Sequence, residues 1–494
     1  MTDTQNRTTR TADPTRAATT AAQRWTLALA AAASFMVALD QLVVASALST
    51  LQRELHASLE ILEWTVNAYN VTFAVLLMTG AALGDRWGRR RLFGWGLALF
   101  TAASAACALS PGVGWLIAAR VVQGAGAALV MPLAMALLSA AFPPRSRGRA
   151  LGLFAALTGL AVAAGPLVGG AVTQGLDWRW IFWLNVPVGL VLVPAARARL
   201  VESVGPPAGI DVVGLLLAAG GTLGLVWGLV RGNAAAGWSS AEVIGAMAAG
   251  LALAAGFVVR QGRAAHPMLP LRLFRSAAFA AGNASAFLLY GALYSAVFFI
   301  AQYLQVGLGY SPLEAGLRTL PWTTTIFVAA PVAGALVERV GPRVLISSGL
   351  LLQAVGLAWI ALDAHAGRGY AASVPALVIA GIGVSMAMPS GQRAVLNSVP
   401  PQAIGKASGT YNMLRQLGGV FGIAILAATF AAHGSYDGPA AFTAGVAPAI
   451  GVGAGLSLLG ALIALATPGR DRAAVTGATA SPAPTAGTPA VPGA

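Results

Sequence analysis

Two ionisable side chains stand inside long apolar stretches of this sequence. Asp40 lies in ASFMVALDQLVVASALS, residues 33–49, and Arg120 lies in LIAARVVQGAGAA, residues 116–128. A charge surrounded by hydrocarbon is costly, so such residues usually pair with each other or mark a path for protons or ions. Arg120 and Gln123 are three residues apart and share one face of a helix. We therefore expect Asp40 to bind and release a proton and Arg120 to control that step. Two alternatives stay open: a hydrogen-bonded Asp40 without a functional role, and an Arg120 that reaches the membrane surface from near a helix end.

The composition indicates a membrane protein. Of the 494 residues, 57% are hydrophobic and only 9% are charged, and the mean hydropathy is +0.74. These values lie outside the usual range of soluble globular proteins. The net charge of +14 does not predict a nucleic-acid partner, because the basic residues lie in short clusters between apolar runs. That arrangement fits anionic lipid headgroups better.

Apolar runs of about 20 residues can cross the hydrocarbon core as helices. The clusters of arginine between these runs, as at 84–91, 145–149 and 197–199, all fall on one side of the membrane. By the positive-inside rule that side is cytoplasmic, so we expect both termini in the cytoplasm of a plasma-membrane protein. We predict an all-α integral membrane protein with fourteen spans, at residues 25–48, 64–84, 92–110, 114–141, 150–173, 179–198, 210–230, 241–260, 277–304, 315–337, 343–362, 372–396, 407–432 and 441–466.

The two halves of the chain resemble each other. A shift of 257 residues lays GAGAALVMP, residues 124–132, on GIGVSMAMP, residues 381–389, and a Pro-Pro pair on a second Pro-Pro pair. Repeats of this kind place a substrate site at their interface near the middle of the membrane and let one bundle move against the other. We predict a disordered cytoplasmic tail at 1–24, a six-helix bundle at 25–198, two inserted helices at 210–260, a second six-helix bundle at 277–466 and a disordered cytoplasmic tail at 467–494.

The loop GDRWGRRR, residues 84–91, resembles the cytoplasmic motif of the major facilitator superfamily, and the chain as a whole resembles that family's fourteen-helix drug:proton antiporters. The resemblance implies a charged latch that closes the cytoplasmic side and opens when the bundles move. A simple anchor of arginines at lipid headgroups is the alternative. Ala81 stands where the family usually begins the motif with glycine. The latch residues are Asp85, Arg86, Gly88, Arg89 and Arg90, with an echo in the second half at Glu338 and Arg339.

The run GLAVAAGPLVGG, residues 159–170, resembles the antiporter motif of the family's fifth span. Gly165 and Gly169 allow another helix to approach closely, and Pro166 removes a backbone hydrogen bond. With Gly170 they form the core of the motif. The order of these residues implies an exporter rather than an uptake carrier, although helix packing alone would also explain the glycines.

Two further matches carry less information. Asp40 and its neighbours resemble the family's first-span motif only in part, because Leu42, Ala45 and Ser49 replace the usual Thr, Asn and Pro. Either another span supplies polar partners to Asp40 or the coupling differs in detail. The run DWRWIFWLNVPVG, residues 177–189, resembles the start of the sixth span, and we assign it no chemistry.

Aromatic and polar residues are candidates for a substrate cavity. Asn283, Phe287, Tyr290 and Tyr294 recur at spacings of four, three and four residues, which places them in one stripe of a helix. Such residues suit amphipathic aromatic compounds through stacking and cation–π contacts. Core packing explains each of them equally well when it is taken singly. The candidate cavity residues are Tyr69, Gln123, Asn283, Phe287, Tyr290, Tyr294, Trp322 and Arg415.

The sequence contains no recognisable site for ATP or a metal. The only Gly-Lys pair, Gly405-Lys406, lacks the rest of a phosphate-binding loop, and the four histidines lack the spacing of a zinc site. We predict a transporter rather than an enzyme, with no cofactor and with the proton motive force as its energy source.

The expected partners are protons, membrane lipids and a small amphipathic drug-like compound, and we expect a monomer that does not bind nucleic acid. The leading function is export of drugs or antibiotics in exchange for protons. The alternatives are an importer or uniporter of a small metabolite, an exporter dedicated to one antibiotic, and a receptor or scaffold.

Overall fold

The computed structural model describes residues 20–55, 57–205, 209–232, 237–265, 267–400 and 403–468. Within these ranges the fold is all-helical, and it contains fourteen helical segments that are long and apolar enough to cross a membrane. The predicted fold class and number of spans are thus confirmed.

The predicted tails, 1–24 and 467–494, lie mostly outside the described residues, but the first helix already begins at Ala21. The Gln23 amide N–H donates to Thr20 Oγ1 at 3.2 Å, and the Thr20 N–H donates to Gln23 Oε1 at 3.0 Å. These two hydrogen bonds cap the N-terminus of α1. The helix therefore begins within polar sequence, which a prediction from apolar residues alone does not include.

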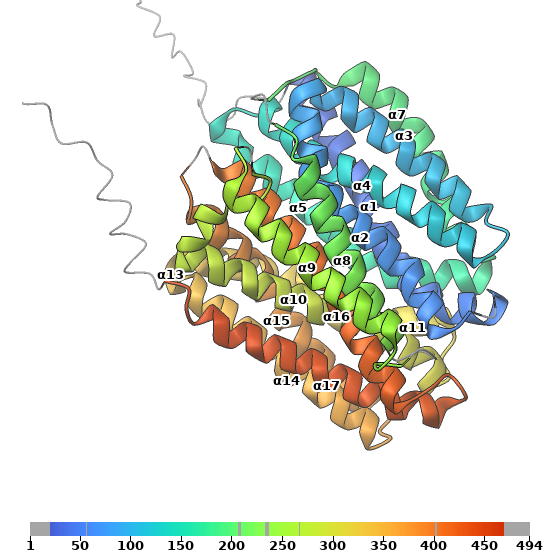
Figure 1. The fold of residues 1–494 in the computed structure, drawn as a ribbon. Coiled ribbons are helices and arrows are strands. Elements are labelled where there is room, and N and C mark those ends of the chain that lie inside the picture. The colour runs from blue at the N-terminus through green and yellow to red at the C-terminus, as the bar shows by residue number, and fades with distance from the viewer. Residues whose placement is uncertain are drawn as a thin grey trace, which may run out of the picture.

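The first half of the chain folds into one bundle, coloured from blue through cyan to the blue-green of α7 in Figure 1. Its helices are α1 (Ala21–Leu55), α2 (Leu59–Trp87), α3 (Arg89–Ala108), α4 (Val113–Ala141), α5 (Pro144–Gly175), α6 (Trp180–Trp183) and α7 (Asn185–Arg199). Helix α4 packs against α1, α2 and α3, while α7 packs against α1 and α3. Neighbouring helices therefore surround the middle of α1, where Asp40 lies.

The second half forms another bundle, in which α10 packs against α15, α16 and α17, and α14 packs against α15 and α17. The span from Pro312 to Val340 consists of three consecutive helices, with breaks at Thr319 and Thr324. The elements are η1 (Leu271–Arg275), α10 (Ala277–Gln302), η2 (Tyr303–Gly307), α11 (Pro312–Arg318), α12 (Leu320–Thr323), α13 (Thr325–Val340), α14 (Pro342–His365), α15 (Tyr370–Asn397), α16 (Ile404–His433) and α17 (Pro439–Ala464).

Two helices that join the halves lie across both bundles, green in Figure 1. They are α8 (Val212–Gly232) and α9 (Ala241–Arg263), which pack along each other. Helix α8 also contacts α2 of the first bundle and α16 of the second. Valines and alanines of the three helices form a small apolar cluster there, which includes Val71, Val226 and Val420. The inserted pair thus covers one side of the interface between the bundles.

The bundles contact each other at the end of the molecule opposite the arginine clusters, which we call the far end; the other we call the arginine-rich end. Gln305 of η2 donates from Nε2 to the Ser46 carbonyl of α1 at 3.1 Å. The Leu313 N–H of α11 donates to Gln174 Oε1 of α5 at 3.0 Å. These bonds hold the far ends of the two bundles together.

The glycines of the run 159–170 make this far-end contact possible. A Cβ on Gly165 or Gly169 would overlap α1 at Leu42 or at the Val43 carbonyl. A Cβ on Gly170 would overlap the Pro312 carbonyl of α11. Helix α5 therefore approaches one helix of each bundle, backbone against backbone, and only glycine leaves room for that approach.

Toward the arginine-rich end, the same helix has no such neighbours. Open space surrounds the positions where a Cβ would stand on Gly148, Gly152 and Gly159. Helix α5 packs against α11 and α12 of the opposing span, whereas side chains of α13 such as Val328 and Val332 are 72% and 53% exposed. The interface along α5 is closed at the far end and open at the arginine-rich end.

We predict that Gly170→Leu separates the far ends of the bundles, because the leucine would occupy the space of the Pro312 carbonyl. The distance between spin labels at Leu109→Cys and Leu362→Cys, both 67% exposed at the far end, should lengthen in pulsed electron-spin measurements. Native Cys107 is buried and should stay unlabelled. Gly159→Leu, on the same helix but facing open space, should leave the distance unchanged. An unchanged distance in Gly170→Leu would show that α5 does not set this closure.

Candidate functional site

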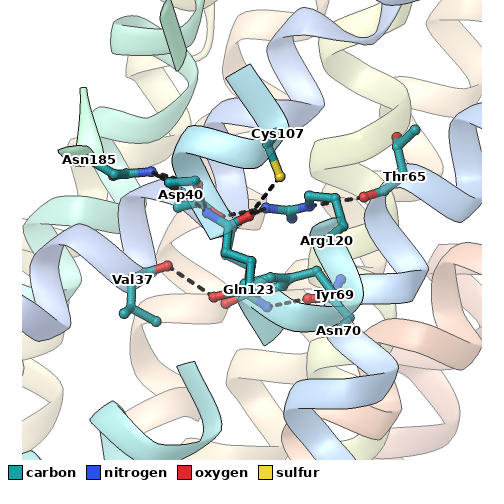
Figure 2. Close-up of polar contacts among 11 residues, drawn as sticks. Val37, Asp40, Thr65, Tyr69, Asn70, Cys107, Arg120, Gln123 and Asn185 are labelled. Carbon is teal, nitrogen blue, oxygen red and sulfur yellow. Dashed lines mark hydrogen bonds and ion pairs between the residues drawn. The ribbon is translucent and has the colours of Figure 1, made fainter. Parts of the chain in front are cut away.

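Asp40 and Arg120 form an ion pair in the middle of the first bundle. Arg120 Nη1 donates to Asp40 Oδ2 at 2.6 Å. Asp40 is 2% exposed and Arg120 is fully buried. The pairing that the sequence suggested is therefore present in the structure, as Figure 2 shows. An Arg120 that snorkels to the membrane surface does not fit this arrangement.

Two side-chain amides complete the surroundings of the carboxylate. Asp40 Oδ1 accepts from Gln123 Nε2 at 2.9 Å and from Asn185 Nδ2 at 2.8 Å. Both amides also donate to Ser104 Oγ, at 2.7 and 2.9 Å. Charge-assisted hydrogen bonds of this kind are shorter and stronger than those between neutral groups. The polar partners missing around Asp40 on α1 are thus supplied by α3, α4 and α7.

Arg120 is held by groups from α2 as well as by Asp40. Its Nε donates to the Thr65 carbonyl at 3.1 Å, and its Nη1 also donates to Gln123 Oε1 at 2.7 Å. The guanidinium lies over the Tyr69 ring, 4.2 Å from the ring centroid. Its remaining nitrogen, Nη2, has no hydrogen-bond partner among the described residues. The guanidinium is fixed in place, yet it retains one unused donor.

Asn185 and Ser104 belong to this cluster, although sequence reasoning singled out neither of them. Asn185 lies in the run 177–189, to which we assigned no chemistry, and the structure shows that it donates to Asp40. The aromatic residues around it suggested only a membrane interface. An asparagine within an apolar span needs a polar partner, and that need was the available signal. Tyr69 and Gln123, predicted as cavity residues, likewise belong to the ion-pair cluster and line neither of the cavities described below.

The latch residues of the first half contact the segment that follows α7. Arg89 pairs with Asp85 of the same loop at 2.7 Å. Glu202 accepts from the backbone N–H groups of Arg90 and Arg91 at 2.9 and 3.2 Å, and so caps the N-terminus of α3. Gly88 has a φ of 102°, which the predicted tight turn requires. Closure of the cytoplasmic side by this loop stays a prediction.

The echo of the latch in the second half shares part of this geometry. Gly341 has a φ of 90°, so the turn after α13 repeats the turn after α2. Glu338 pairs with Arg393 of α15 at 3.6 Å, and both side chains are largely exposed. Arg339 lies at the end of α13.

The predicted cavity residues of the second half do not all meet. Tyr290 and Tyr294 stack at 5.7 Å, and the Arg415 guanidinium lies 5.2 Å from the Tyr290 ring centroid. Tyr294 OH also donates to Gln416 Oε1 at 3.4 Å. In contrast, Asn283 bonds to the Phe279 carbonyl of its own helix, and Phe287 packs on Phe421.

Two small cavities lie between the bundles. The first is lined by residues of α5, α10, α12 and α15, among them Pro166, Leu293 and Trp322. The second is lined by α1, α2, α10 and α16, among them Asn70 and Tyr294. Their walls are mostly apolar and aromatic. Trp322 and Tyr294 are thus the two predicted residues that line these cavities.

Comparison with known proteins identifies the family. Residues 30–423 match the family model of the Major Facilitator Superfamily. The chain belongs to this superfamily. It is therefore a multi-pass membrane transporter and not an enzyme.

Its relatives include proteins named for resistance, one of which is also named for export. The superfamily transporter is 36% identical to the tetracenomycin C resistance and export protein of Streptomyces glaucescens, over 83% of this chain and 76% of that one. It is 34% identical to the multidrug resistance protein Stp of Mycobacterium tuberculosis, over 81% and 74%. Among solved structures, an inward-facing, unoccupied bacterial homologue of the human lysosomal transporter Spinster aligns with a TM-score of 0.66 at 16% identity, over 93% of this chain and 99% of that one. This last similarity shows the fold.

We predict that Arg120→Gln strongly destabilises the transporter, because Asp40 is left as a buried carboxylate without a cation. Breaking one half of a buried ion pair costs about 3–5 kcal/mol. Thermal unfolding in detergent, followed by size-exclusion chromatography, should show a lower midpoint. The double variant Asp40→Asn/Arg120→Gln should recover part of the loss. A midpoint equal to that of the parent in Arg120→Gln would contradict the ion pair.

Proposed function

We propose that this transporter exports drug-like or antibiotic compounds in exchange for protons, and that Asp40 binds the transported proton. The observation that carries the proposal is the buried pair of Asp40 and Arg120, in which both side chains are almost completely enclosed within the spans. The names of its relatives, one an export protein for an antibiotic and one a multidrug resistance protein, support the direction and the class of cargo.

The geometry supports a simple exchange at Asp40. In the conformation described, Arg120 occupies Oδ2 and two amides occupy Oδ1. A proton and the guanidinium compete for Oδ2, because a neutral carboxyl no longer attracts the cation strongly. When a bundle movement admits a proton to the site, the proton binds Oδ2, and Arg120 shifts toward its other partners, the Thr65 carbonyl and Gln123. When Arg120 returns, the proton leaves, and the carboxylate is again compensated.

The direction of pumping follows from the proposed orientation. The positive-inside rule places the arginine-rich end in the cytoplasm, so the described conformation is open toward the cytoplasm and closed at the outer, far end. A compound would enter the interface from the cytoplasmic side. Inward movement of one proton through a potential of 100 mV yields about 2.3 kcal/mol, which is sufficient to expel a weakly bound compound.

The lining of the interface fits amphipathic aromatic cargo. Trp322 and Tyr294 offer ring faces at the two cavities, and Asn70 adds a polar group to the second. A cavity of this type recognises shape and aromatic character more than one particular functional group. The same walls would serve an exporter of one antibiotic or of several.

We expect Asp40→Asn to abolish export driven by a pH gradient, because the amide cannot bind and release a proton. Uptake of ethidium or of a tetracycline into inverted proteoliposomes under a pH gradient measures this directly. Asp177→Asn, which removes an exposed carboxylate of the same bundle, should leave export intact. Export by folded Asp40→Asn protein at the parental rate would refute the assignment.

We also expect Trp322→Ala to weaken cargo binding without affecting proton coupling. Loss of one aromatic stacking partner should raise the apparent KM for aromatic compounds by roughly 2- to 10-fold while the maximal rate stays similar. Concentration series in the same vesicles give both constants. Trp180→Ala is the matched control, since Trp180 is 47% exposed at the far end. Equal KM values in both variants would remove Trp322 from the cargo site.

A further inference from the structure

A second carboxyl group is buried in the spans, apart from Asp40. Glu63 lies near the beginning of α2 and is only 3% exposed. Its Oε2 is enclosed and has no hydrogen-bond partner among the described residues. One turn further along, Asn67 is fully buried, and neither its amide nitrogen nor its oxygen has a partner there. The first two turns of α2 thus bury polar atoms that no other described residue satisfies.

Glu63 and Asp40 differ in the hydrogen-bond donors around their carboxyl groups. Asp40 has a guanidinium and two amide donors, whereas Glu63 Oε2 has no donor within the part of the chain that the structure describes. An ionised carboxylate that is buried without a counter-charge or donors is strongly disfavoured, and the neutral acid is tolerated much better. In this conformation, burial therefore favours a protonated Glu63.

Glu63 lies at the far-end part of α2, a helix that packs against α16 of the second bundle. A titratable neighbour from the second bundle is Tyr436, in the connection between α16 and α17. Burial raises the pKa of Tyr436, and the negative charge of an ionised Glu63 raises it further. The Tyr436 hydroxyl donates to Gln302 Oε1, and its ring packs on Phe442. The connection that carries Tyr436 is therefore close enough to Glu63 to respond to its charge.

The other charged groups of this region are engaged elsewhere. Helix α2 packs against α1, α3, α4, α8 and α16. Of the basic residues that these helices contribute near the far end, Arg53 bonds to the Ser49 carbonyl, Arg120 to Asp40, Arg231 to Glu60 and Glu242, and His433 to the Thr429 carbonyl. The remaining titratable groups there are Glu54 of α1, Glu60 and Tyr69 of α2, Cys107 of α3 and Asp437 of the connection after α16. Glu60, close to Glu63 on the same helix, adds repulsion rather than compensation.

The space around Glu63 fits a proton better than a bulky cation. Neither Glu63 nor Asn67 lines either of the cavities between the bundles. An ammonium group of a drug-like compound would need room for its substituents next to the carboxylate. A proton needs none.

We propose that Glu63 is a second proton-binding site, and that the far end closes over it only when it carries a proton. When the far ends separate, water reaches Glu63 and stabilises its carboxylate. A proton from the aqueous phase then binds to the carboxylate, and the neutral acid can be covered again. Protons at the far end thereby favour closure. The inference rests on the bundle movement of the proposed function, but not on Asp40 or on the nature of the cargo.

The test follows far-end closure as a function of pH. In purified full-length protein with spin labels at Leu109→Cys and Leu362→Cys, alkaline pH should lengthen the distance and acidic pH should shorten it. Glu63→Gln should stay closed at every pH, because the amide imitates the protonated acid. Glu63→Asp should keep the pH response. Glu54→Gln, the same chemical change at an exposed carboxylate on the neighbouring helix, should behave as the parent.

An Asp40→Asn background removes any contribution of Asp40 to the pH response of far-end closure, so that the contribution of Glu63 can be measured alone. There, protein that retains Glu63 should still respond to pH, and protein that also carries Glu63→Gln should not. A parental pH response in Glu63→Gln, or loss of every pH response in Asp40→Asn alone, would overturn the proposal. Failure to export any compound would contradict the proposed function and leave the proposed closure over Glu63 intact.

A measurement without any substitution of Glu63 protects the test against misfolding of the Glu63→Gln variant. At neutral pH, Asp40→Asn protein should still show the infrared band of a protonated carboxylic acid, slow to shift in deuterated water because the group is buried. If that band is missing, Glu63 is ionised in the closed conformation and the proposal is wrong.

Discussion

The pairing of Asp40 with Arg120 is the interaction on which the first bundle depends. A membrane offers no water to either charge, so each must be compensated by protein. That compensation draws in Gln123 from α4, Asn185 from α7, Ser104 from α3 and the Thr65 carbonyl from α2. These helices must therefore keep their positions around α1 for the charges to be tolerated. The bundle is rigid at this level because a displaced donor would leave a buried charge unsatisfied.

The contact between the bundles is built in the opposite way. Within the first bundle, long polar side chains interlock; between the bundles, α5 meets α11 through glycine and backbone atoms. Such a surface gains dispersion energy over a short distance, and it separates without pulling side chains out of pockets. Few hydrogen bonds, such as those of Gln305 and Gln174, must be exchanged for water when it opens. A rigid body with a readily parted interface is what alternating exposure of a site requires.

Much of this could be predicted from the sequence, and the failures have physical reasons. The spans and the charged pair were accessible, because hydropathy is a local property and an intramembrane charge must have a partner. The contact of Asn185 with Asp40 could not be predicted, because the two residues are 145 positions apart. No pattern in the neighbouring sequence indicates that they meet. Tyr69 was placed in the cavity because its ring suits cargo, while the structure uses the ring to support Arg120. In the sequence, Glu63 near the start of a helix resembles a polar residue at the exposed end of a span, and only the fold shows that it is buried.

The inserted helices restrict how the two bundles can part. Helix α8 packs on α2 and on α16 through an apolar cluster that includes Val71, Val226 and Val420. Apolar contacts are not directional, so they permit small sliding but resist separation. On the α5 side of the interface, the open space at Gly152 and the exposure of Val328 are consistent with bundles that have parted toward the arginine-rich end. In the bundle movement that we propose, the covered side is the hinge and the α5 side is the opening. Helix α2, which carries Glu63, packs against both α8 and α16 at this interface, so parting of the far ends there would change the access of water to Glu63.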